Sequence, residues 1–198
     1  MQELSLNPSS MAYFFYPELI DAVPAYKKNK WGSKESLAIY TALVALQEQA
    51  NINISLINKK VLPGKHVFIV YNSKEWASGG LEQIISQSLS SCGQDKVKNL
   101  SQKILQENMG YRFFVQTKVQ EELMLKGLLL KEVSQRPLIG SRVSIRENLK
   151  DKTLLRRKLP LLQVMLEQFA SQEPELAKLL AKDVAKSLMP PVAAGLFT

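Results

Sequence analysis

The segment 119–146, VQEELMLKGLLLKEVSQRPLIGSRVSIR, constrains the fold most, because an amphipathic run, a helix breaker and two strand-like runs follow one another there without a spacer. Apolar residues recur at helical spacing in its first part, at Val119, Leu123, Met124 and Leu128. Gly127 would cost about 1 kcal/mol inside a helix relative to alanine, so we expect the helix to end there. LLLKEV and RVSIRE, separated by Pro137 and Gly140, then predict a hairpin over residues 128–146. A helix that continues through residue 133 into a bundle is the competing interpretation.

The order of helix, Gly-Leu-Leu, strand, basic loop and strand resembles the end of a winged-helix domain. That resemblance implies a nucleic-acid-binding wing with Arg136 at its tip. Arg142 and Arg146 would share one strand face, since an even number of residues separates them. A winged helix also requires a helix-turn-helix just before the wing, whereas YRFFVQ at residues 111–116 favours a strand.

The rest of the chain predicts helices around a small sheet. Ser33 is a candidate N-cap for a nearly all-apolar, central helix that runs to about Gln49. HVFIVY at residues 66–71 is the clearest strand, and the segment 51–57 is a second candidate. Further helices are expected at residues 81–90, at 96–108, and after Pro160 and Pro174, each of which suits the first turn of a helix. The fold class we expect is therefore α+β, predominantly helical, with strands near 66–71, 111–116 and the 128–146 hairpin.

One domain with loose ends accounts for the length and composition. A chain of 198 residues with 45% hydrophobic content can bury one substantial core. We expect a flexible leader at residues 1–11, a globular α+β domain at residues 12–189 and an apolar tail at residues 190–198. Met11 is an alternative start. The four adjacent aromatics Tyr13–Tyr16 and the 190–198 tail are candidates for docking a protein partner, and a segment laid over the core is the preferred interpretation of the aromatics.

The net charge of +8 is concentrated in two places. Residues 118–160 contain eleven Lys or Arg against five Asp or Glu, and residues 26–34 add four lysines without an acid. Localised positive charge favours a phosphate-bearing or acidic partner, although a basic solvated face is also common in soluble proteins. The candidate nucleic-acid-binding residues are Arg136, Arg142, Arg146, Lys150, Lys152, Arg156, Arg157 and Lys158, with Lys27, Lys28 and Lys30 as a second patch beside Trp31.

Residues for catalysis or metal binding are sparse. Cys92 and His66 are the single cysteine and the single histidine, so the sequence offers neither an internal disulfide nor a Cys/His zinc set. The Gly79-Gly80 pair before a helix matches no phosphate-binding glycine motif. We therefore expect no cofactor, no metal and no enzymatic activity, and no segment is long and apolar enough to span a membrane.

These observations lead to a functional expectation with one alternative. We expect a non-enzymatic, cytoplasmic protein that binds nucleic acid or takes part in nucleoprotein assembly, contacting phosphates through its basic 136–158 region. The alternative is a protein-interaction adaptor or a subunit of a larger complex, such as a secretion or assembly machine, whose basic surface meets an acidic partner. The sequence leaves open whether the partner is DNA, RNA or protein, and it leaves the oligomeric state open.

Overall fold

The structure is a computed structural model. It describes residues 6–27, 32–58, 64–74, 76, 79–97, 99, 111–136, 140–147 and 149–188, with side chains except at residues 27, 111, 112, 131–136, 140–147, 149–151 and 154.

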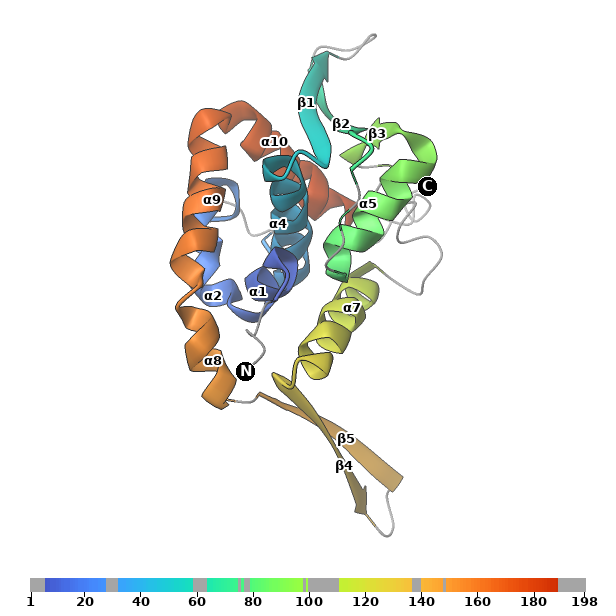
Figure 1. Ribbon diagram of the computed structural model, residues 1–198, viewed down its shortest axis with the longest axis vertical. Coiled ribbons are helices and arrows are strands. Elements are labelled where there is room, and N and C mark those ends of the chain that lie inside the picture. Colours follow the sequence, from blue (N-terminus) through green and yellow to red (C-terminus); the bar gives the residue numbers. More distant parts are fainter. Residues whose placement is uncertain are drawn as a thin grey trace, which may run out of the picture.

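Helix α4 (Lys34–Glu48) forms the centre of the molecule, as the sequence predicts (Figure 1). Its start is fixed by a capping box, in which the Ser33 hydroxyl accepts from the Ser36 amide at 3.1 Å and the Ser36 hydroxyl accepts from the Ser33 amide at 2.8 Å. Every residue from Ser36 to Leu46 is buried. A helix that is apolar on all sides must be covered on all sides, and α1, α5, α7, α9 and α10 all pack against it.

The N-terminal segment belongs to the core. It forms α1 (Pro8–Phe14), α2 (Tyr16–Leu19), the 3-10 turn η1 (Ile20–Ala22) and α3 (Pro24–Lys27). Residues 6 to 11, which the predicted leader includes, are buried or half-buried around the start of α1. Among the aromatics, Phe15 is fully buried and the other three are half-buried against the core, which confirms the interpretation of a segment laid over it.

A three-stranded antiparallel sheet lies at one end of the molecule (Figure 1). The two predicted strands form β1 (Ile52–Asn58) and β2 (Lys65–Tyr71), which pair from Ile52 opposite Tyr71 to Asn58 opposite Lys65. The short β3 (Gln94–Lys96) pairs on the other side of β2 and follows α5 (Gly80–Cys92).

The strand predicted at residues 111–116 is wrong, because this segment is the first part of a helix, α7 (Tyr111–Leu125). Aromatic and β-branched residues favour a strand locally. However, Val115, Val119 and Leu123 recur every four residues and are all buried, so the whole segment gains more by presenting one helical face to the core. Most of the helix predicted at residues 96–108 lies outside the described residues.

The predicted hairpin is confirmed as β4 (Leu129–Arg136) and β5 (Gly140–Glu147), so residues 129–133 are strand and do not continue the helix. The chain turns out of α7 at Gly127, whose φ of 71° is a left-handed conformation that glycine adopts without strain. The Gly127 amide donates to the Met124 carbonyl at 2.9 Å and the Leu128 amide to the Leu123 carbonyl at 2.8 Å. These two hydrogen bonds close the end of the helix, and β4 begins directly afterwards at Leu129.

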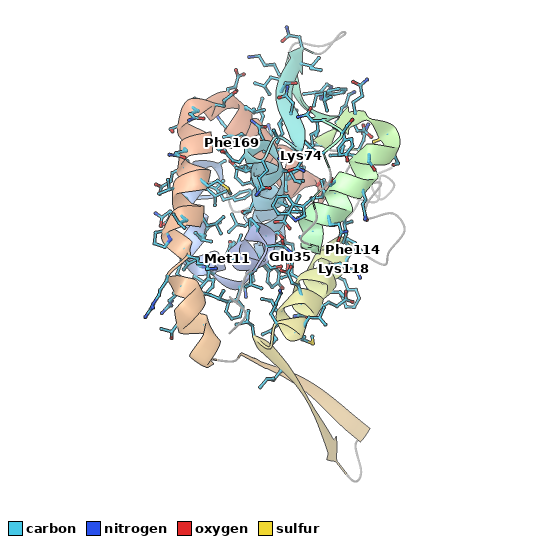
Figure 2. The ribbon with its side chains drawn as sticks, in the orientation of Figure 1. Met11, Glu35, Lys74, Phe114, Lys118 and Phe169 are labelled. Atoms are coloured by element: carbon cyan, nitrogen blue, oxygen red, sulfur yellow. The ribbon has the colours of Figure 1, made fainter. Side chains whose placement is uncertain are left out.

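After the two hairpin strands, the described residues form three more helices, namely α8 (Leu149–Arg156), α9 (Leu159–Gln172) and α10 (Pro174–Ser187). Pro160 and Pro174 lie in the first turns of α9 and α10, as predicted. Phe169 of α9, labelled in Figure 2, packs edge-on against Tyr40 of α4 with ring centroids 6.2 Å apart. The predicted α+β class, richer in helix than in strand, is confirmed. Within the described part of the chain, no helix has the length and apolar character needed to cross a membrane.

Candidate nucleic-acid interface

The β4–β5 hairpin, which we call the ribbon, projects from the helical body on the side opposite the three-stranded sheet (Figure 1). Its two strands pair without interruption from Leu129 opposite Glu147 to Arg136 opposite Gly140. They form a sheet of their own, with no third strand among the described residues. An isolated two-stranded hairpin is marginally stable in water. The ribbon therefore depends on its base, where Leu128 and Leu129 are buried beside α7.

The register of the ribbon gathers three of the predicted site residues. Arg142 is opposite Ser134, Arg146 is opposite Leu130, and Arg136 is opposite Gly140. Residues that face each other across an antiparallel pair share a face, and so do residues an even number apart along one strand. These positions therefore belong to one face of the ribbon, while Val133, Val143 and Ile145 belong to the other.

Two of the predicted cations in α8 contact the N-terminal helices. The Lys152 ammonium lies 5.0 Å from the Phe14 ring centroid, within the range of a cation–π interaction. Arg156 Nη2 donates to Glu18 Oε1 at 2.9 Å, and this hydrogen bond holds the pKa of Glu18 below its ordinary value. Both contacts tie α8 to α1 and α2. They therefore engage, within the protein, two of the cations that the sequence predicts to bind a partner.

The other predicted site residues are only partly described. The Arg157 side chain is exposed and that of Lys158 is half-buried, immediately after α8. Lys150 is in α8 and Lys27 ends α3, both with side chains outside the described set, and Lys28 and Lys30 lie outside the described residues altogether. The structure thus brings Arg136, Arg142 and Arg146 onto one element and connects them to α8, whereas of the second patch at residues 27–30 it describes only the backbone of Lys27.

A buried polar cluster, which we call the clasp, is the feature that sequence reasoning missed. Glu82 of α5 is fully buried, and both its oxygens accept hydrogen bonds from Ser9, from the amide and from the hydroxyl, each at 2.7 Å. Glu122 of α7 accepts from the amide and the side-chain Nδ2 of Asn7, both at 3.0 Å, and from the Ser10 hydroxyl at 2.6 Å. The two carboxylates thereby replace the intrahelical partners that the first amides of α1 lack.

The clasp also changes the ionisation of Glu82. Burial raises its pKa to about 7, and the charge of Glu122 acts in the same direction, against the hydrogen bonds from Ser9. Gly80 allows the close approach, because a Cβ at this position would lie 2.5 Å from Asn7 Nδ2. The Asn7-Pro8 pair is a recognisable helix start. No local signal, however, identifies two glutamates from distant helices as its partners.

Cys92 is half-buried at the end of α5, and its thiol lies 3.4 Å from the Ser88 carbonyl. The described residues hold no cluster of three or more His, Cys, Asp or Glu suited to a metal ion.

Comparisons with protein-family models, with curated proteins and with solved structures gave no match for this chain.

Proposed function

We propose that this protein is a non-enzymatic nucleic-acid-binding or nucleoprotein-assembly protein that contacts phosphates through the ribbon and the adjoining start of α8. The observation that supports the proposal most is the ribbon itself, an element that projects from the body and carries Arg136, Arg142 and Arg146 at positions of one face. A two-stranded ribbon is narrow enough to enter the major groove of a duplex.

The chemistry of arginine suits this role. Its guanidinium group keeps its charge at all physiological pH values and presents several donors to phosphate oxygens. Strand residues four apart are separated by about 14 Å, so Arg142 and Arg146 would contact different phosphates. Such contacts provide affinity and orientation without reading sequence, and they weaken steeply as salt rises.

The experiment compares the full chain with a variant in which Arg136, Arg142 and Arg146 are all replaced by Glu. We expect the unaltered protein to bind duplex or single-stranded DNA or RNA at low salt in a fluorescence-anisotropy assay, and the variant to lose nearly all of this binding. A matched control replaces Lys178, Lys182 and Lys186, the exposed lysines of α10, by Glu and changes the net charge equally. Equal loss in both variants would show that the binding follows net charge and not the ribbon.

The second candidate is a protein-interaction adaptor or a subunit of a larger complex. The exposed apolar residues at the junction of α7 and the ribbon favour it, because the Leu125 and Leu130 side chains are 87% and 50% exposed. The ribbon face that holds Val133, Val143 and Ile145 adds further apolar positions. The same assay separates the two candidates, since an adaptor would show no salt-sensitive binding to any of the nucleic acids. The terminal tail at residues 190–198 lies outside the described residues.

A further inference from the structure

The outer edge of β5 is a free strand edge. β5 pairs with β4 on one side, and no third strand pairs with it among the described residues. Beyond its base, the ribbon stands clear of the helical body (Figure 1). A strand edge presents backbone N–H and C=O groups that can pair with a further strand. Since a two-stranded hairpin is marginally stable in water, a third strand would also stabilise the ribbon.

The register divides β5 into two chemically different faces. Arg142 and Arg146 occupy positions of one face, with Ser144 between them, whereas Val143 and Ile145 occupy positions of the other. A strand added beside β5 continues this alternation, because residues opposite each other share a face. Negative charge is favoured beside the two arginines, and apolar side chains are favoured beside Val143 and Ile145. The edge therefore suits a strand in which acidic and apolar residues alternate.

The outer edge of β4 lacks this pattern. Glu132 lies at a position of the arginine face, where it would repel an acidic residue of an added strand. Lys131 lies among the apolar positions of the opposite face. At its base, β4 also packs against α7. The charges of the ribbon thus favour strand addition at β5.

We propose that β5 accepts, as a third strand of the ribbon, an extended segment of a partner protein in which acidic and apolar residues alternate. Backbone hydrogen bonds hold the segment, and its alternating side chains set the register. This role goes beyond the proposed function, because it assigns a protein segment and not a phosphate backbone to the ribbon. Both partners engage Arg142 and Arg146, so the segment and nucleic acid compete.

An octapeptide of alternating Glu and Val, capped at both ends and fluorescently labelled, is the probe. At nanomolar peptide concentration, which avoids self-association, its fluorescence anisotropy should show saturable binding to the full chain. NMR of the complex should show backbone amide shifts centred on β5. A peptide of the same composition, in which all glutamates precede all valines, should bind roughly tenfold more weakly, because its acidic and apolar side chains do not separate onto two faces.

Methylation of the peptide backbone distinguishes strand addition from charge attraction alone. Alternate amides of a strand point to opposite edges, so only the Glu amides or only the Val amides point toward β5. One peptide carries N-methyl groups on every Glu and another carries them on every Val, and both keep all side chains. One of them should lose binding and the other should keep it. This comparison uses the unaltered protein, so it does not depend on the folding of a variant.

A charge reversal tests the two arginines. Arg142→Glu combined with Arg146→Glu should weaken binding of the alternating peptide by about tenfold or more, because two attractions become repulsions. Lys178→Glu combined with Lys182→Glu, on the exposed surface of α10, changes the net charge equally and should leave binding unchanged.

Three results would overturn the proposal. They are no binding of the alternating peptide, like behaviour of the two methylated peptides, and equal binding by the arginine and lysine variants. Nucleic-acid binding without peptide binding would refute the third strand alone, whereas peptide binding without nucleic-acid binding would refute the proposed function alone.

Discussion

At the scale of single residues, the clasp places two carboxyl groups from α5 and α7 against the start of α1. A fully buried carboxyl such as Glu82 is tolerated only when its oxygens are hydrogen-bonded. Ser9 supplies both bonds, and Glu122 is held in the same way by Asn7 and Ser10. The start of α1 is thereby attached to α5 and α7 through side chains rather than through packing alone.

The ionisation of Glu82 makes the stability of the protein depend on pH. The pKa of Glu82 is raised in the folded state, to about 7 from an ordinary value of 4.5, so the folded protein retains a proton that the unfolded chain releases. The contribution of this group to the free energy of unfolding is therefore complete below about pH 4.5 and is lost as pH rises to about 7. Glu82→Gln, which mimics the protonated acid, should remove this part of the dependence. Chemical unfolding at a series of pH values measures it.

Glu48→Gln, on the exposed last turn of α4, is the matched control and should leave the pH profile of the unaltered protein in place. Parallel profiles for the Glu82→Gln variant and the unaltered protein would contradict the role assigned to Glu82.

The sequence alone could not predict this cluster. Ser9 and Glu82 are 73 residues apart, and Asn7 and Glu122 are 115 apart, so only the packing of three helices brings them together.

At the scale of elements, α7 and the ribbon show what sequence periodicity can and cannot predict. The helix end at Gly127 and the two strands could be predicted because a left-handed glycine and alternating strand residues are local signals. The start of α7 could not, because the aromatic run at residues 111–114 favours a strand locally and the core contacts of Val115 decide for a helix. This region thus resembles the end of a winged-helix domain in the order of its last elements. The described elements that precede the hairpin here are α5, β3 and α7.

Gly127 controls the change from helix to ribbon, which gives a prediction at this scale. Gly127→Ala should lower the free energy of unfolding by about 1 kcal/mol, because alanine is strained at a φ of 71° although nothing lies within 4 Å of the added Cβ. Gly127→Asn should lose distinctly less, since asparagine tolerates the left-handed conformation. Urea unfolding of both variants measures the difference. Equal losses for alanine and asparagine would show that the backbone conformation is not the cause.

At the scale of the whole molecule, charge and shape are distributed unevenly. The helical body buries α4 on all sides, the three-stranded sheet lies at one end, and the ribbon extends from the other (Figure 1). The local excess of positive charge that the sequence shows at residues 118–160 thus falls mainly on the ribbon, on α8 and on Arg157 and Lys158 directly after it, whereas the α7 part of this range carries one lysine and two glutamates. Part of it is used internally, because Lys152 and Arg156 contact Phe14 and Glu18. In the proposed function, the phosphate contacts therefore fall chiefly to the ribbon.

The salt dependence of nucleic-acid binding tests this assignment most directly. Neutralising Arg136, Arg142 and Arg146 together as Gln removes three cations without adding repulsion. If each contacts a phosphate of a duplex, the slope of log K against log salt should become shallower by about 2.7, which is three times the value for one released counterion. Removing the three exposed lysines of α10 in the same way should leave the slope unaltered. A slope that stays the same after the ribbon arginines are neutralised would contradict the central claim.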